Sequence, residues 1–200
     1  MKKYILSFQD WVCDLEEEFQ WAKVTDMLYM HWKMNPLSME KLLHAGTELW
    51  YALLECNYYK SAPKAPENFE FIDRDLTMNR LIEITKFGEL HFGDNPIFNA
   101  YFGVMIDVQP FFFFTSEDNC EEWFEKGEKM IEYAYTQDSE SLFVQGLYCQ
   151  LTHSKGKEPF EEVCKKIWSV VTPKQWGESG VNRYFFYYLS GELFYPNEYQ

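Results

Sequence analysis

The spacing of apolar residues constrains the fold of this chain more than any other feature of its sequence. Between residues 5 and 22 the apolar side chains recur at intervals of three and four, which is the repeat of one face of an α-helix. These residues are Ile5, Phe8, Val12, Leu15, Phe19 and Ala22. Because Asp10, Asp14 and Glu17 fall on another face, we predict an amphipathic helix in this stretch.

The limits of further helices follow from residues that cap or interrupt the same pattern. Asn35-Pro36 should end the first helical region, because proline pushes the preceding residue out of the α conformation. The residues suited to begin later helices are Ser38, Asp73 or Asp75, Ser116, Ser139 and Pro159. The predicted helices span residues 38–59, 76–90, 97–108, 117–136, 140–151, 160–171 and 181–193.

Only two brief runs, at 68–72 and 110–114, suit a β-strand, so we predict an all-α fold. Its eight to ten helices should form an irregular array of helical hairpins or a bundle. The 200 residues, 46% of them apolar, are enough for one domain spanning 1–200, with a possible subdomain boundary at the prolines within 60–70. A weak self-similarity between 99–107 and 182–190, which share Asn-x-Tyr-Phe, favours the array.

Charge and aromatic content narrow the classes of partner. The chain has 18 Lys and Arg against 32 Asp and Glu, a formal net charge of −14. Nucleic acid is therefore an unsuitable partner, because binding its backbone requires clustered cations. The charge favours a cationic partner protein, or it serves only to keep the chain in solution. Because 20% of the residues are aromatic, we also expect some rings at the surface, where they often form contact sites.

The cysteines and the apolar segments indicate a cytoplasmic protein. The five cysteines are odd in number and widely spaced, as reduced core thiols would be, and no secretory leader is recognisable at the N-terminus. The apolar stretch 96–114 is interrupted by Asp107, Gln109 and Pro110. We therefore predict a buried helix followed by a short apolar turn there, and no membrane segment.

No motif indicates catalysis or a cofactor. The four histidines lie in different elements and none is in an HExxH arrangement, so no metal site is expected. Asp73 and Asp75 resemble the start of a calcium loop, but Met78 stands where the loop needs glycine. Because nucleophile elbows and phosphate-binding loops are also absent from the sequence, we predict neither an enzyme nor a cofactor.

The segment "QPFFFFTSEDNCEEWFEKGEKM", residues 109–130, places four phenylalanines directly before a helix rich in glutamate. We expect the phenylalanines to be the buried corner between two helices and the acids to be the outward face of the second. Lys126 and Lys129 should pair with Glu122 and Glu125 at spacing i,i+4. The acidic face is either an ordinary solvated surface or a docking surface. The predicted partner-binding residues are Glu117, Asp118, Glu121, Glu122, Glu125 and Glu128, together with Asp14 and Glu17.

In composition, the chain resembles bacterial immunity proteins, the small acidic partners of nuclease toxins in contact-dependent inhibition and colicin-like systems. The resemblance rests on the net charge, on stretches such as "CDLEEEF" and "SEDNCEEWFE", and on the aromatic excess. It implies that acidic side chains would block the basic groove of a nuclease toxin.

Two other functions remain open from the sequence. One is a helical-repeat scaffold or adaptor for protein–protein interaction, which would hold a peptide or a subunit on a concave face. The other is an enzyme or a small-molecule binder, with a pocket lined by Asn99, Tyr101, Asn182 and Tyr184.

Overall fold

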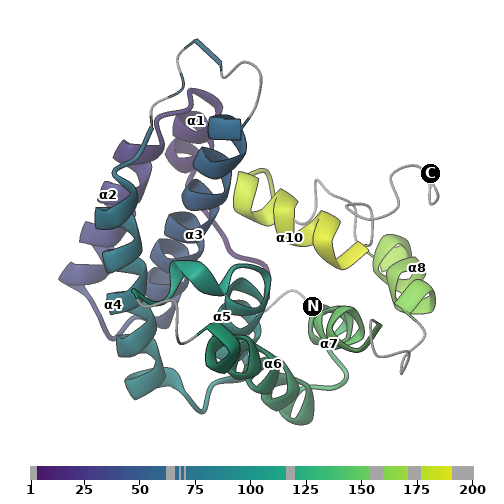
Figure 1. The fold of residues 1–200 in the computed structure, drawn as a ribbon. Helices are drawn as coiled ribbons and strands as arrows, with labels where there is room; N and C mark the ends of the chain where they lie inside the picture. Colours follow the sequence, from purple (N-terminus) through teal and green to yellow (C-terminus); the bar gives the residue numbers. More distant parts are fainter. Residues whose placement is uncertain are drawn as a thin grey trace.

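The computed structural model describes residues 4–61, 66–67, 69, 71–115, 120–153, 160–170 and 177–190. Within these ranges the chain forms nine α-helices and a short 3₁₀ helix, and it contains no β-strand (Figure 1). The predicted all-α fold of eight to ten helices is therefore confirmed. In the same part of the chain, no helix is both long and apolar enough to cross a membrane.

The N-terminal region is less helical than its periodicity predicts. Helix α1 spans Asp10–Glu17 and α2 spans Trp21–Met34, separated by a tight turn in which Phe19 adopts a φ of +58°. Residues 5–9 are not helical, so the prediction of one helix across 5–22 is wrong. The carbonyl of Leu6, which a helix would use internally, instead accepts a hydrogen bond from Asn182 Nδ2 at 2.8 Å. Tertiary bonding to the distant end of the chain thus replaces local helix formation.

Helices α3 (Met39–Ser61) and α4 (Arg74–Phe92) begin where the capping residues predict. The hydroxyl of Ser38 accepts from the backbone N–H of Lys41 at 3.4 Å, and the carboxylate of Asp73 accepts from Leu76 N–H at 3.0 Å. Helix α3 packs against both α2 and α4 (Figure 1). Most of the proposed boundary at 60–70 lies outside the described residues, but the helices on its two sides pack directly together.

Helix α5 (Pro96–Val108) is the predicted buried helix, and the 3₁₀ helix η2 (Pro110–Phe112) is the apolar turn after it. Helix α6 (Cys120–Gln137) then packs closely along α5. Two glycines permit this approach, because a Cβ on Gly127 would lie 2.8 Å from the backbone nitrogen of Asp107 and one on Gly103 would lie 3.1 Å from the carbonyl oxygen of Gly127. The predicted cap Ser116 lies outside the described residues.

The C-terminal helices are α7 (Leu142–His153), α8 (Phe160–Val170) and α10 (Gly180–Ser190). Helix α7 begins two residues later than predicted, and Ser139 is not its cap. The carbonyl of Ser139 instead accepts from the side-chain amide of Gln145 at 2.7 Å. The predicted first-turn Pro159 lies outside the described residues. Helix α10 returns across the molecule to pack against α3, α7 and α8 (Figure 1).

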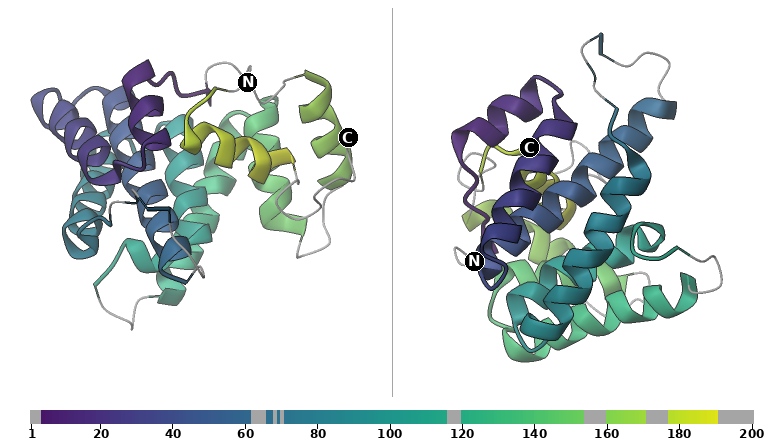
Figure 2. Two further views of the ribbon diagram at one scale, coloured as in Figure 1. Left: turned by 90° about the horizontal axis from the view of Figure 1, so that it is seen from above. Right: turned by 90° about the vertical axis from the view of Figure 1, so that its left-hand side faces the viewer.

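The N-terminal segment and α10 join the two sides of the molecule into one continuous core (Figures 1 and 2). The ring of Tyr4 stacks on Phe143 of α7 at 4.9 Å between centroids, and its hydroxyl donates to Asp138 Oδ2 at 2.7 Å. The self-similar segments 99–107 and 182–190 lie in α5 and α10. They meet within this core, where the rings of Tyr101 and Phe185 pack edge to face with 4.9 Å between their centroids. Distant parts of the sequence therefore share one apolar interior.

Candidate functional site

The phenylalanine run is divided between the core and the surface. Phe112 and Phe113 are buried, as expected for a helix-to-helix corner, but Phe111 keeps 51% of its surface exposed and Phe114 is half-buried. The ring of Trp123 at the start of α6 stacks on the end of this run. Its centroid lies 6.0 Å from the ring centroid of Phe113 and 6.3 Å from that of Phe114. The corner therefore presents aromatic surface next to the acidic helix, in addition to filling the core.

One row on α6, exposed except for the half-buried Glu128, carries most of the carboxylates of this helix. We define this row, the acidic stripe, as Glu121, Phe124, Glu125, Glu128 and Glu132, which follow each other at spacings of three, one, three and four. Phe124 is 40% exposed within the stripe. The buried face is formed instead by Gly127, Met130, Ile131 and Ala134. Phe124 lies seven residues before the buried Ile131 and so projects close to the same side of α6, and it is exposed because it stands at the border of the buried face near the start of the helix.

The two lysines of α6 pair differently from each other. Lys129 contacts Glu125 at 3.0 Å, as predicted for the i,i+4 spacing. Lys126, predicted to pair with Glu122, instead forms an ion pair with Glu89 of α4, and its ammonium lies 4.2 Å from the ring centre of Trp123. The ammonium of Lys126 is thus held on the side of α6 that faces α4. Among the described residues, no basic side chain forms an ion pair with the exposed Glu121, Glu122 or Glu132.

The structure separates the other predicted partner-binding residues from this stripe. Asp14 and Glu17 are exposed on α1, which lies at the opposite end of the molecule from α6 (Figures 1 and 2). Glu117 and Asp118 lie outside the described residues. The predicted set is therefore divided between two separate acidic surfaces, one on α1 and one on α6.

Behind Glu17 lies a hollow of about 340 Å³ between α1, α3 and α10. Its lining includes Glu16, whose Oε2 accepts from the backbone N–H of Gly180 at 2.7 Å. Burial raises the pKa of Glu16 to about 7, although the Gly180 N–H opposes the shift. Arg183 lies nearby on α10 and also stabilises the charged form of Glu16. Glu16 therefore holds the first turn of α10 against α1.

Glu48 on α3 has no exposed surface, and its carboxyl group lies beside that of Glu16. As long as both carboxyl groups are ionised, neither Glu48 oxygen has a hydrogen-bond partner within the described residues. Burial, together with the neighbouring charge of Glu16, raises the pKa of Glu48 well above its ordinary value. At neutral pH a protonated Glu48 can thus donate to an ionised Glu16. Sequence reasoning missed this pair, although the position of Glu48 directly before the apolar run "LWYALL" was a signal for it.

The residues suggested for a ligand pocket are mostly used within the core. The hydroxyl of Tyr101 donates to the backbone carbonyl of Tyr4, and Asn182 donates to Leu6. The ring of Tyr184 packs edge-on to Trp50 at 5.1 Å. Asn99 Nδ2 donates to the carbonyl of Gly93 at 2.7 Å. These polar groups hold helices and connecting segments together, and they do not converge on one cavity.

No metal centre is formed by the part of the chain that the structure describes, since no three His, Cys, Asp or Glu side chains there are placed to hold an ion. Comparison with known proteins assigns no family to the chain. No family model, no curated protein and no solved structure matches it.

Proposed function

We propose that this chain is a binding protein that docks a cationic partner protein on the outer face of α6. The observation that carries the proposal is the acidic stripe, where Phe124 stands exposed between Glu121 and Glu128 at the border between the buried and outer faces of α6. Aromatic side chains at the centre of an interface supply apolar contact, and charges around them orient the partner. The stripe combines both features on one rigid helix.

The electrostatic attraction should act mainly on the rate at which the partner associates. The stripe holds four carboxylates, of which Glu125 forms an ion pair with Lys129, whereas Glu121 and Glu132 form none within the described residues. A net charge of −14 extends the attraction over the whole molecule. Such fields steer a basic partner and can raise association rates from about 10⁵–10⁶ to 10⁸–10⁹ M⁻¹ s⁻¹ at low salt. Because charges are screened over about 8 Å at physiological ionic strength, binding should weaken as salt is added.

The composition supports a more specific form of this function, an immunity-type protein that neutralises a nuclease toxin. A nuclease binds the phosphate backbone in a groove of lysine and arginine. A row of carboxylates on a straight helix presents a similar series of negative charges. In this form of the proposal, α6 occupies the basic groove and blocks access of the nucleic acid.

An adaptor function is the second candidate, and one observation favours it. Met30, Met34 and Leu37 form an exposed apolar row at the end of α2, with 55%, 70% and 67% of their surfaces accessible. Methionine-rich surfaces adapt to varied apolar partners. Binding through this row would be largely independent of salt.

The decisive experiment is affinity capture of the tagged chain at low and high salt, followed by binding kinetics with the captured protein. Reversing Glu121 and Glu125 to lysine should slow association about tenfold while leaving helix content unchanged. The matched control reverses Asp14 and Glu17 on α1, which makes the same change in net charge at the other acidic surface. Phe124→Ser should instead speed dissociation, since it removes apolar contact.

The outcomes separate the two functions. A basic partner released by salt, with the α6 reversal more damaging than the α1 reversal, supports docking on the acidic stripe. Equal slowing by both reversals would show that net charge alone acts, and would refute a specific face. A partner retained at high salt and lost on Met34→Ser would establish the adaptor instead.

A further inference from the structure

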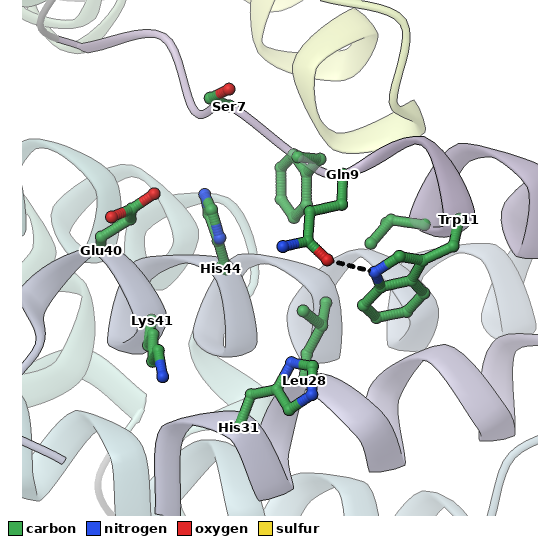
Figure 3. A pocket seen from close by; sticks show the side chains of 10 residues that line it. Ser7, Gln9, Trp11, Leu28, His31, Glu40, Lys41 and His44 are labelled. Carbon is green, nitrogen blue, oxygen red and sulfur yellow. Dashed lines mark hydrogen bonds between the residues drawn. The ribbon is translucent and has the colours of Figure 1, made fainter. Parts of the chain in front are cut away.

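A separate hollow of about 270 Å³ opens between the N-terminal segment and helices α1, α2 and α3 (Figure 3). It lies outside the acidic stripe and has a different chemical character. Its lining consists of Ser7, Phe8, Gln9, Trp11, Val12, Leu28, His31, Glu40, Lys41 and His44. At about 30 Å³ per water molecule, the hollow has room for about nine waters, or for a ligand with a similar number of non-hydrogen atoms.

Aromatic and aliphatic groups form the walls and floor of this hollow. The ring of Phe8 stacks on His44 with 4.5 Å between centroids, and Trp11 meets His31 edge-on at 6.0 Å. The buried side chains of Val12 and Leu28 supply an apolar floor. Ligand sites of small molecules typically have such apolar walls with a few oriented polar groups. The hollow therefore suits a ligand with an aromatic or branched aliphatic group.

Three polar side chains of the lining, Gln9, Lys41 and His44, have nitrogen atoms that can bind a ligand. Gln9 accepts from the indole N–H of Trp11, which fixes its amide so that the NH₂ group is turned toward His44 (Figure 3). The ammonium of Lys41 has no ion pair within the described residues. His44 Nε2 is buried and also lacks a hydrogen-bond partner there. Buried polar atoms are rarely left unsatisfied, so the His44 Nε2 atom indicates that a ligand or water completes its surroundings.

The charged side chains of the lining indicate which charge a ligand should carry. Lys41 supplies a cation, while Glu40, the one carboxylate in the lining, lies at the edge on the far side of His44 from Gln9 (Figure 3). An anionic group placed between Lys41 and the Gln9 amide would have a donor on each side, whereas Glu40, on the same side of His44 as Lys41 (Figure 3), would repel a second anionic group. The arrangement therefore favours a ligand with one negative charge and an apolar body.

We propose that this hollow binds a small monocarboxylate with an aromatic or branched apolar body. The carboxylate is held by Lys41 and the amide of Gln9, and the imidazole of His44 completes its surroundings. The body lies against Trp11 and Leu28. This site is independent of partner docking, because it uses no residue of α6.

The test uses phenylacetate as the probe and phenylacetamide, which has the same shape without the charge, as the matched ligand. Each is titrated into the full ¹⁵N-labelled chain while the Trp11 indole and Gln9 amide resonances are followed. We expect phenylacetate to give saturable shifts with a Kd below about 1 mM, and phenylacetamide to bind at least about tenfold more weakly. Lys41→Met should reduce phenylacetate affinity about tenfold and leave phenylacetamide unaffected, while Lys23→Met on α2 serves as the control.

Three results would overturn the proposal. Absence of saturable shifts with phenylacetate would show that the hollow holds only water. Equal affinity for the two ligands would remove the role of the carboxylate. Unchanged phenylacetate binding in Lys41→Met, in a variant whose spectrum shows the native fold, would place the ligand elsewhere.

Discussion

The buried pair of Glu16 and Glu48 predicts how the stability of this chain depends on pH. Burial raises the pKa of Glu48 well above 4.5, so the folded protein keeps the Glu48 proton at pH values where the unfolded chain has lost it. A group whose folded pKa is raised contributes stability that is complete below the unfolded pKa and is lost as the pH rises. The unfolding free energy should fall by about 1.4 kcal/mol per pH unit on account of Glu48 alone.

Glu16 acts in the same direction up to about pH 7, where its own carboxyl ionises in the folded protein. Its displacement from 4.5 to about 7 corresponds to about 3 kcal/mol of stability lost across that window. The substitution Glu48→Gln removes one titrating group and keeps an N–H that can donate to Glu16. Relative to the unaltered chain, the stability of the variant should therefore rise with pH above 5.5, by up to about 1.4 kcal/mol per pH unit for as long as Glu48 stays protonated in the folded unaltered chain.

Urea unfolding followed by tryptophan fluorescence at half-unit steps from pH 5.5 to 8 measures this difference. Glu132→Gln on the exposed face of α6 is the control, because that carboxylate is in contact with water in both the folded and unfolded chains. Its stability difference should stay constant with pH. A constant difference for Glu48→Gln as well would refute the reasoning, since it would mean that Glu48 ionises equally in both states.

Two further substitutions test the packing and the caps. Gly127→Ala should lower the unfolding free energy by about 1–3 kcal/mol, because the Cβ of the alanine would lie 2.8 Å from the backbone nitrogen of Asp107. A variant as stable as the original would show that α5 and α6 separate easily. Asp73→Ala should cost about 1 kcal/mol by removing the cap on Leu76 N–H, measured by thermal unfolding, whereas Asp73→Asn should retain most of that stability.

The Phe111–Phe124 region connects the aromatic excess of the sequence to its acidity. Both rings are exposed, and the carboxylates of the acidic stripe surround Phe124. Apolar surface of this kind promotes self-association in a neutral protein. Carboxylates around it repel a second copy of the same chain and attract a basic one. The same arrangement can therefore serve both solubility and selective binding.

Interactions between residues close together in the sequence explain the features that could be predicted from the sequence. The repeat of apolar residues set the all-α fold, Asp73 and Ser38 marked the starts of two helices, and the apolar run before Asp107 became a buried helix. The outward direction of the glutamates on α6 also followed from spacing alone. In each case the deciding contacts join residues within about one turn of helix, so a short stretch of sequence contains the required information.

The tertiary structure decided the features that depend on residues distant in the chain. Lys126 lies within reach of Glu122, yet it pairs with Glu89 because α4 brings that carboxylate to its flank. Glu16 meets the N–H of Gly180, 164 positions later, and the burial around them changes the protonation of both buried glutamates. The hollow at His44 likewise exists only where three helices meet the N-terminal segment. Desolvation and pairing depend on what the folded chain brings together, and residue spacing alone does not specify that arrangement.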